Sequence, residues 1–333
     1  MRIAIVGATG VVGREVVKEL EHFDIACDLE LYASKRSEGL EIAFKDKLHT
    51  VKAFDLNLLK GADFVLMSAG AEFSREWSPQ LADLGCMVID NSSAWRMDAE
   101  VPLLVPEVNA SLIRHRTGSG VIANPNCSTI QMVVTLKPLL DAFGIQAVTV
   151  STYQSVSGTG KEALEELSRQ RSQKVNDEPL SFSIYDRPIV DNIIPAIDVL
   201  DDQGHCFEEQ KMVEETRKIL GCSDLPIYAS TARVPLSLCH TESILVELSK
   251  EVTIGDLTDV FEGAEGVKLC PVSASYDSLP DPRSVSGTRD VWVARLRLPF
   301  GKRSSKMVQY WNIADNLKKG AATNAVQILK CFL

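Results

Sequence analysis

One cysteine stands where a reactive thiol would be expected. Cys127 follows the turn sequence Asn-Pro-Asn and precedes the apolar run STIQMVV, so a helix is predicted to begin beside it. Unpaired N–H groups at a helix N-terminus stabilise a thiolate and can hold an oxyanion. A thiolate is a good nucleophile for covalent catalysis, so Cys127 is the candidate nucleophile. A cysteine is more commonly a small core residue, and the other seven are interpreted in that way.

A glycine-rich turn near the N-terminus predicts a dinucleotide site. Residues 2–6 (RIAIV) are typical of a buried strand, GATGVVG follows them, and residues 11–22 are amphipathic. Glycines let the backbone approach a pyrophosphate, and the helix N-terminus offers N–H groups to it. Because the spacing is GxxGxxG rather than GxGxxG, a tight turn without a ligand is the alternative.

The next predicted strand, residues 28–33, ends in a turn that bears on the choice of dinucleotide. It is followed by Ser34, Lys35, Arg36 and Ser37, where a site for NAD usually carries an acidic residue. Two cations and two hydroxyl groups suit a 2′-phosphate, because Arg forms paired charge-assisted bonds to it. The turn therefore favours NADP. Taken alone, a solvated basic turn is the commoner explanation of such residues.

Strands and helices alternate through the first third of the chain. Further strands are predicted within residues 62–70, 86–96 and 118–126, and a helix broken near Pro79 is predicted over residues 74–85. This alternation predicts a doubly wound parallel sheet of the Rossmann type, whose ligands bind at the carboxyl ends of the strands.

The rest of the chain predicts a second α/β domain. The predicted elements are a strand from residue 147, helices over 161–175 and 208–221, two strands around a turn in 227–249, a strand over 291–300 and a helix over 310–333. We place the domain boundary near residue 125. Residues 1–125 would form the dinucleotide-binding domain, the helix over 310–333 would return to it, and residues 126–309 would form the second domain.

Composition restricts the class of partner. The 333-residue chain has a formal charge of −10, which argues against nucleic acid or an anionic membrane as the main partner but allows a small anion. None of the eight cysteines forms a CxxC pair and histidines are few, so no metal site is expected. Free thiols, no signal peptide and no apolar run of membrane-spanning length predict a cytoplasmic protein.

Eight motifs occur in an order that resembles a known family. They are GATGVVG, DNSSAWR, VPLLVPEVN, NPNCSTIQ, STYQSVSGTG, EEQKM, ARVPLSLCHTES and DNLKKGAA. Over about residues 2–330 the chain resembles the bacterial NADP-dependent aspartate-semialdehyde dehydrogenases. The resemblance implies a Rossmann domain and an α/β catalytic domain that forms the interface of a homodimer or a dimer of dimers. It also implies reduction of L-aspartyl 4-phosphate by NADPH to L-aspartate 4-semialdehyde through a Cys127 thioester, toward lysine, threonine, methionine and diaminopimelate.

The resemblance also assigns roles to individual residues. The catalytic residues would be the nucleophile Cys127, the acid/base His240 and the acyl-orienting Gln154. Substrate would be held at its carboxylate by Arg233, at its ammonium by Glu208, and at its phosphate by Lys211, Arg96 and Asn126. The cofactor-binding residues would be Gly7, Thr9, Gly10, Val11, Val12, Arg36, Ser37, Ser157, Gly158 and, at the nicotinamide carboxamide, Asn316. From sequence alone, Glu208 and Lys211 are better explained as a solvated ion pair one helical turn apart.

Two other functions remain open at this point. N-acetyl-γ-glutamyl-phosphate reductase has similar architecture and thiol chemistry, but its substrate has no ammonium group for Glu208 to bind. A non-catalytic protein that senses NADP could keep the same fold. The remaining histidines occupy polar or loop-like contexts and are expected at the surface; they are His22, His49, His115 and His205.

Overall fold

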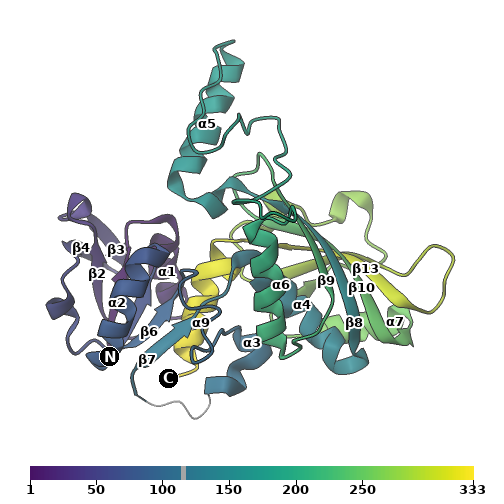
Figure 1. Cartoon of the computed structure of the whole chain (residues 1–333), viewed down its shortest axis with the longest axis horizontal. Coiled ribbons are helices and arrows are strands. Elements are labelled where there is room, and N and C mark those ends of the chain that lie inside the picture. The colour runs from purple at the N-terminus through teal and green to yellow at the C-terminus, as the bar shows by residue number, and fades with distance from the viewer. Residues whose placement is uncertain (114–117) are drawn as a thin grey trace. The chain divides into compact units, whose positions relative to one another are not determined.

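The computed structural model describes residues 1–113 and 118–333, and they fold into two compact units. One unit comprises Met1–Asn126 and Gly320–Leu333, and the other comprises Cys127–Lys319. The C-terminal helix α9 (Thr323–Lys330) belongs to the first unit, and Figure 1 shows it beside the strands of that unit.

The first unit is built on a seven-stranded sheet with the order β3-β4-β2-β1-β5-β6-β7. Its strands are β1 (Arg2–Val6), β2 (Asp28–Ala33), β3 (Glu41–Phe44), β4 (Lys47–Ala53), β5 (Phe64–Met67), β6 (Met87–Asp90) and β7 (Gly120–Ala123). Neighbouring strands are parallel except in the β3–β4 hairpin at one edge. The predicted Rossmann-type sheet is confirmed, and the hairpin is an addition that the sequence had not indicated.

Alternation along β1 explains why helices cover both faces of this sheet. Ile3 and Ile5 pack in one apolar cluster with α1 (Val11–His22) and α9, whereas Ala4 and Val6 pack in the cluster that includes Leu81 of α2 (Ala71–Asp83). Successive side chains of a strand point to opposite faces, so an apolar strand of this kind needs cover on both sides.

The helix predicted to break at Pro79 is continuous, and this prediction was wrong. Helix α2 (Ala71–Asp83) runs through Pro79. Proline removes one helical hydrogen bond, but the hydroxyl groups of Ser74 and Ser78 both donate to the buried carboxylate of Asp90 at the end of β6. These bonds hold the part of the helix that precedes Pro79 against the sheet.

The second unit has a six-stranded mixed sheet with the order β11-β12-β13-β10-β8-β9. Its strands are β8 (Ile145–Gln154), β9 (Ile227–Arg233), β10 (His240–Val252), β11 (Val267–Leu269), β12 (Val291–Arg297) and β13 (Ser305–Ala314). One apolar cluster joins the sheet to α4 (Cys127–Phe143), α6 (Phe207–Leu220) and α7 (Ile254–Glu262). Helix α5 (Lys161–Val175) extends away from this sheet in Figure 1.

Short helices complete the structure. They are α3 (Pro106–Asn109), α8 (Pro282–Val285), the 3₁₀ turns η1 (Lys35–Ser37), η2 (Leu56–Leu59), η3 (Ala110–Ile113), η4 (Val156–Thr159) and η5 (Tyr276–Ser278), and the π-turn Lys318–Ala322.

The helix predicted over residues 310–333 is wrong in its first part. Strand β13 continues to Ala314, and helical structure begins only at Lys318. Tyr310, Trp311 and Ile313 are aromatic or β-branched, and they lie between β10 and β12, where backbone pairing on both sides favours a strand. The two strands predicted around a turn in residues 227–249 exist, but β8 lies between them.

Gly13 gives the first testable prediction. A Cβ atom at Gly13 would lie 2.2 Å from the carbonyl oxygen of Gly7, so Gly13→Ala must displace the glycine loop. We expect a loss of about 1–3 kcal/mol in the free energy of unfolding, measured with urea. Gly70→Ala is the control, because Gly70 directly precedes α2 and its Cβ would meet nothing within 4 Å. Equal stability of the two variants would contradict this packing.

Candidate active site

Three predicted site residues lie where strands of the second sheet begin or end, and these strand ends together form one edge of the sheet. Gln154 ends β8, Arg233 ends β9 and His240 begins β10. Gln154 is paired with Arg233 in the parallel β8–β9 ladder, and antiparallel pairing brings the start of β10 beside the end of β8. The strand register alone therefore collects an amide, a guanidinium and an imidazole at the same edge.

Helix α4 brings its first turn to this edge. Gln131, one turn after Cys127, donates from Nε2 to Asn312 Oδ1 at 3.0 Å and to the carbonyl oxygen of His240 at 3.5 Å. Cys127 is the first residue of α4, and its side chain is partly exposed and in no disulfide. The start of α4, which carries Cys127, is thus hydrogen-bonded through Gln131 to His240, the residue predicted to act with Cys127.

His240 is fully buried, and one of its two ring nitrogens has hydrogen-bond partners. The backbone N–H of Ser155 donates to Nδ1 at 3.1 Å, and the Ser155 hydroxyl lies 3.2 Å from the same atom. Nε2 has no hydrogen-bond partner among the described residues. Burial and, secondly, the charge of Arg233 lower the pKa of His240 to about 3. The imidazole is therefore neutral at physiological pH.

Glu208 and Lys211 form a partly buried ion pair rather than a solvated one. Glu208 accepts from Gln154 Nε2 at 3.1 Å and from Lys211 Nζ at 3.2 Å. Lys211 also donates to Asp198 at 2.7 Å. Burial lowers the pKa of Lys211, but the charges of Glu208 and Asp198 outweigh it and raise that pKa above its ordinary value. The solvated alternative is wrong, because Glu208 is 4% exposed and bonded to Gln154 at the sheet edge.

Arg233 borders a cavity of about 610 Å³ in the second unit. Its Nη1 donates to the carbonyl oxygen of Ser155 at 2.8 Å, and no carboxylate is paired with it among the described residues. The other residues around the cavity come from η4, the segment after α5 and the residues before α6: Thr159, Ile184, Tyr185, Asp186, Arg187, Ile194, Ala196, Ile197, Asp198, Val199 and Leu200. A cavity with a buried, unpaired cation on its wall suits a small anionic substrate.

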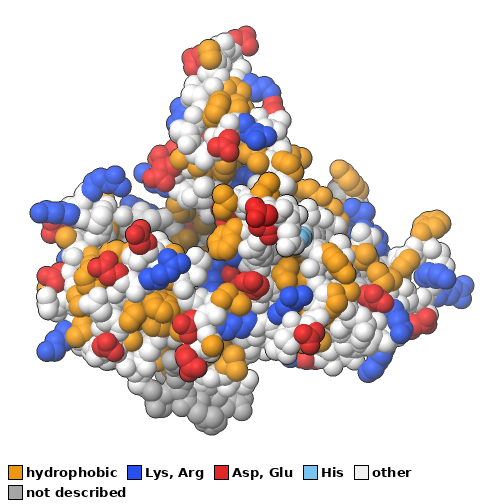
Figure 2. All heavy atoms as spheres, viewed as in Figure 1, with side chains coloured by type: hydrophobic (Ala, Val, Ile, Leu, Met, Phe, Trp, Pro, Cys, Tyr) orange, Lys and Arg blue, Asp and Glu red, His pale blue; other side chains and the backbone are white. Residues whose placement is uncertain are grey.

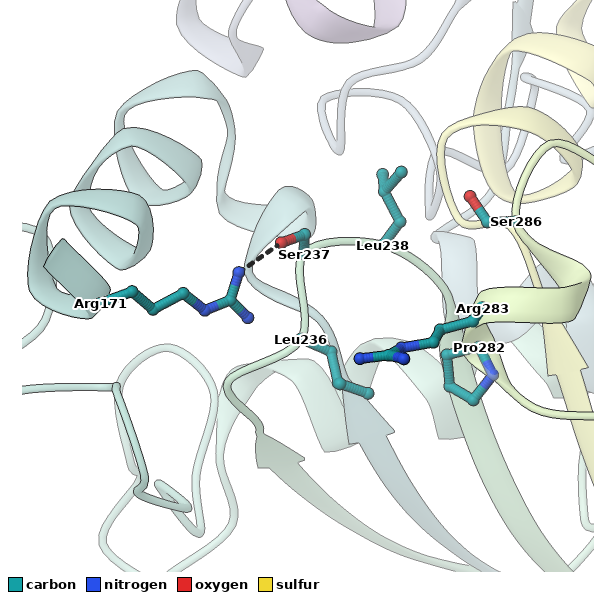
Figure 3. Close-up of a pocket in the computed structure, with 7 residues that line it drawn as sticks. All are labelled: Arg171, Leu236, Ser237, Leu238, Pro282, Arg283 and Ser286. Carbon is teal, nitrogen blue, oxygen red and sulfur yellow. Dashed lines mark hydrogen bonds between the residues drawn. The ribbon is translucent and has the colours of Figure 1, made fainter. Parts of the chain in front are cut away.

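A second pocket lies beside the loop that leads to His240. Figure 3 shows Arg171 of α5 and Arg283 of α8 on either side of residues 236–238, with Arg171 bonded to the Ser237 hydroxyl. This pocket measures about 550 Å³. None of the predicted catalytic residues borders it, so the chemistry is assigned to the sheet edge.

Asn316 and Ser157 lie in a buried network with Ser155. The hydroxyl groups of Ser155 and Ser157 each donate to Asn316 Oδ1 at 3.2 Å, and Asn316 Nδ2 donates to Ser157 Oγ at 2.9 Å. The N–H of Cys239 also donates to Asn316 Oδ1, at 3.0 Å. The amide of Asn316 is thus engaged by protein groups beside His240, and its predicted contact with a nicotinamide stays a prediction.

Gly158 lies close to Arg233 and His240 at this edge. A Cβ atom there would lie 3.0 Å from Arg233 Nη1 and 3.2 Å from His240 Nε2. A side chain at position 158 would therefore crowd both nitrogens, and glycine avoids this.

The glycine loop of the first unit fits a dinucleotide. Gly7 has a φ of 87°, and its Cβ would lie 2.4 Å from the carbonyl oxygen of Ser68, so only glycine is accommodated there. Thr9 donates to the hydroxyl of Ser37 at 3.3 Å, which joins the loop to the turn carrying the exposed Arg36. Gly10, Val11 and Val12 form the start of α1, whose first N–H groups have no helical partner.

Arg96 is fixed close to the end of β7 in the first unit. Its Nε donates to the carbonyl oxygen of Asn124 at 3.0 Å, and its Nη2 donates to that of Asn91 at 2.9 Å. Asn126 is buried two residues after Asn124. Arg96, from the loop after β6, is thus bonded to the segment that carries Asn126 and continues directly into α4.

Several residues of this region were missed by sequence reasoning. Ser155 and Glu242 had recognisable signals, because Ser155 lies between two predicted residues and Glu242 follows His240 at the two-residue spacing of one strand face. Asp198 had none, since it lies in an irregular segment. Gln131 could have been found four residues after Cys127, on the same face of its helix.

Other predicted features are mostly peripheral. His22 and His205 are exposed, His49 is partly buried, and His115 lies outside the described residues. On the face drawn in Figure 2, acidic and basic side chains are interspersed. Among residues 1–113 and 118–333, no group of His, Cys, Asp and Glu could hold a metal, and no helix has the length and apolarity to cross a membrane.

Comparisons with known proteins cover the whole chain. The family model described as "Semialdehyde dehydrogenase, NAD binding domain" matches residues 2–116, and the "dimerisation domain" model of the same name matches residues 136–319. Aspartate-semialdehyde dehydrogenase from Aquifex aeolicus is 45% identical, covering 100% of this chain and 98% of the relative. The protein of that name from Bacillus subtilis is 41% identical, covering 98% of this chain and 96% of the relative.

A solved structure agrees with these matches. The crystal structure of aspartate semialdehyde dehydrogenase II complexed with ASA from Vibrio cholerae superposes with a TM-score of 0.92 at 39% identity. The alignment covers 99% of this chain and 97% of that chain.

Glu242 gives a prediction about pH. Burial raises its pKa to about 8, and the amides of Asn312 and Gln131 only partly offset this. The folded state therefore keeps a proton that the unfolded chain releases above the ordinary glutamate pKa of 4.5. The free energy of unfolding should fall between these two pKa values, by on the order of 1 kcal/mol per pH unit at most.

The test is thermal unfolding of Glu242→Gln from pH 5 to 9. The variant should lose less stability than the wild type as pH rises, because its amide cannot ionise. Glu247→Gln, exposed on the same strand, is the control and should follow the wild type. Parallel curves for the wild type and Glu242→Gln would show that folding does not raise the pKa of this carboxyl.

Proposed function

The chain belongs to the aspartate-semialdehyde dehydrogenase family of NAD(P)-dependent oxidoreductases, and we propose that it reduces L-aspartyl 4-phosphate with NADPH to L-aspartate 4-semialdehyde and phosphate. The observation that carries this proposal is the meeting of Gln154, Arg233 and His240 at the sheet edge to which the first turn of α4 is anchored. The reaction would serve lysine, threonine, methionine and diaminopimelate synthesis in the cytoplasm.

Cys127 is the nucleophile in this proposal. Its position at the start of α4 favours the thiolate, because helix N–H groups face it. The thiolate, whose proton has already passed to solvent, attacks the acyl carbon, and the bond from that carbon to the phosphate oxygen breaks, so that phosphate leaves. Gln154, held by Glu208, orients the acyl group without competing for protons.

The first unit would hold the reductant. When bound, the dinucleotide supplies the hydride that reduces the thioester carbonyl. Arg36 and Ser37 are placed to bind the 2′-phosphate of NADP, since Ser37 is bonded to Thr9 of the glycine loop and Arg36 is exposed beside it. Ser157, Gly158 and Asn316 belong to the second unit and would adjoin the nicotinamide.

Charge explains the choice of substrate. The α-carboxylate of aspartyl phosphate would pair with Arg233, whose guanidinium is buried without a carboxylate partner among the described residues. Its ammonium group would pair with Glu208, and Lys211, Arg96 and Asn126 would bind the phosphate. An N-acetylated substrate would leave the Glu208 carboxylate without a cation from the ligand, which disfavours it.

We also propose a homodimer formed by the second unit. The matching family model is a dimerisation domain, and its residues 136–319 include the whole six-stranded sheet. On the face of this sheet that lacks α4, Tyr153 and Trp311 stack with ring centroids 5.5 Å apart and stay partly exposed. Partly exposed aromatic residues of this kind are enriched at protein–protein interfaces.

The central test is phosphate-dependent reduction of NADP⁺ by L-aspartate 4-semialdehyde, which runs the reaction in reverse. Cys127→Ala should lower kcat by at least about a thousandfold, because the covalent step is lost, while NADPH binding measured by fluorescence should persist. Cys331→Ala removes an exposed thiol and should leave activity unchanged.

Two outcomes would redirect the assignment. Activity confined to the N-acetylglutamate analogue would replace the proposed substrate. A Cys127→Ala protein that binds NADPH and performs its cellular task like the wild type would indicate a sensing protein instead.

Arg36 gives a separate prediction about the cofactor. Arg36→Ala should raise KM for NADP⁺ about tenfold or more, because a charge-assisted bond to the 2′-phosphate contributes about 1.5–3 kcal/mol, and should leave KM for NAD⁺ nearly unchanged. Arg75→Ala, an exposed arginine of α2, is the matched control. An equal effect of Arg36→Ala on both dinucleotides would refute the assignment of the 2′-phosphate site.

A further inference from the structure

A carboxyl group is buried between the second sheet and the start of α4. Glu242 is the third residue of β10 and is 0% exposed. Its strand partners are Thr152 of β8 on one side and Asn312 of β13 on the other. Two residues farther along β10, Ile244 packs in the apolar cluster that includes side chains of α4 and α6. Alternate residues of a strand share a face, so Glu242 lies on the face that α4 covers, in the last polar layer before the apolar core.

Helix α4 contributes the amide of Gln131 to this layer. Gln131 Nε2 donates to Asn312 Oδ1 at 3.0 Å, and Asn312 Nδ2 donates to the Gln131 carbonyl oxygen at 3.3 Å. Both amides partly offset the effect of burial on the pKa of Glu242, so both lie near its carboxyl. Gln131 follows Cys127 by four residues and shares its face of the helix. Any contact that holds the Gln131 side chain therefore also limits where Cys127 can lie.

Three buried oxygens of this layer lack a hydrogen-bond donor. They are Oε1 and Oε2 of Glu242 and Oε1 of Gln131, and none has a partner among the described residues. An ionised carboxylate can only accept, so it would leave all three without a donor, whereas a protonated carboxyl has an O–H group to donate. Gln131 Oε1 is an acceptor in the same layer that this O–H group can satisfy, and burial of unsatisfied oxygens is unfavourable.

The groups that surround Glu242 also favour an uncharged carboxyl. Burial raises the pKa of Glu242 to about 8, and the charge of Glu208 on α6 adds to this effect. Tyr310 of β13 stays neutral because burial raises its pKa, and His240 on the same strand stays neutral because burial lowers its pKa. The neighbours from β8 and α4 are uncharged: Thr152 and Gln131. No cation of the described part of the chain bonds to the Glu242 carboxyl.

We propose that Glu242 is a positioning residue, whose uncharged carboxyl donates a hydrogen bond to the Gln131 side chain and thereby holds the start of α4, with Cys127, at the sheet edge. This inference rests on the proposed function, in which Cys127 is the nucleophile. Glu242 acts through Gln131 and takes no part in the bonds that form and break. Its ionisation would replace the donor by a charged acceptor beside Gln131 Oε1, and the two oxygens would repel each other.

Infrared spectroscopy tests the state of the carboxyl without catalysis. The difference spectrum between the wild type and Glu242→Gln at pH 7 should contain the carbonyl band of a protonated carboxylic acid. The band should weaken as pH rises through the Glu242 pKa of about 8. Glu247→Gln, exposed on the same strand, is the control and should remove only carboxylate bands. A carboxylate band for Glu242 at pH 7 would overturn the inference.

Amide hydrogen exchange tests the hold on the helix, again without catalysis. Glu242→Leu removes the donor and should speed exchange over residues 130–134 of α4 about fivefold or more, as expected when one buried hydrogen bond is lost. Glu242→Gln keeps an N–H donor and should exchange like the wild type. Gln131→Met removes the acceptor instead and should act like Glu242→Leu, so it serves as the test if Glu242→Leu does not fold. Wild-type protection in Glu242→Leu or, where that variant does not fold, in Gln131→Met would overturn the inference.

Kinetics test the consequence for the reaction. Glu242→Leu should lower kcat about a hundredfold with KM nearly unchanged, because misplacing a reacting group by about 1 Å costs this much. Glu242→Gln should keep most of the wild-type kcat. The protonated form is the active one, so the wild-type kcat should fall as pH rises through about 8, and that of Glu242→Gln should not.

The outcomes separate this inference from the proposed function. Wild-type kcat in Glu242→Leu, or the same fall with pH in the wild type and Glu242→Gln, would overturn the positioning role and leave the proposed reaction intact. A wild type that is inactive with the semialdehyde would refute the proposed function, and the infrared and exchange measurements would still decide whether Glu242 holds α4.

Discussion

The pairing of β10 with its two neighbours is the constraint on which the site depends. β10 is antiparallel to both β8 and β13, so its first residue lies beside the last residues of both. A shift of one residue in this register would turn His240 to the other face of the sheet, away from α4. The same shift would separate its ring from the N–H of Ser155, which is the first residue after β8. The arrangement of the candidate site is thus determined by sheet register more than by the loops.

Polar contacts between α4 and the sheet define where this helix, which carries the proposed nucleophile, lies. Close to the site, Gln131 bonds to Asn312, and one turn farther along Thr135 bonds to Tyr310 at 3.0 Å. Deeper in the unit, α4 meets the sheet through apolar side chains such as Leu139. Apolar contacts tolerate small sliding movements, whereas buried hydrogen bonds penalise any arrangement that leaves a partner unsatisfied. The polar pairs therefore fix α4 along its axis, and with it the position of Cys127.

Sequence patterns predicted the elements whose structure depends mainly on neighbouring residues. The glycine loop, α1 and the helix beginning at Cys127 follow from turn chemistry and periodicity, and the structure has them at the expected residues. Residues 310–314 could not be assigned in this way, because an apolar aromatic run is compatible with a helix or a buried strand until its neighbours are known. Asp198 bonds to Lys211 across 13 residues, and the raised pKa of Glu242 results from complete burial. The local sequence indicates neither feature.

The state of Arg233 explains why this edge is interpreted as a binding site. In a chain with a net charge of −10, a buried arginine would ordinarily find a carboxylate. Glu208, the acidic residue of the same edge, is instead bonded to Lys211 and Gln154. Arg233 bonds to the neutral carbonyl of Ser155, so its charge remains uncompensated by any described carboxylate. An anionic ligand would supply the compensation. Burial lowers the pKa of the neighbouring His240, and the charge of Arg233 adds to this effect. The guanidinium that is placed to attract an anion thus also acts on the titration of the imidazole beside it.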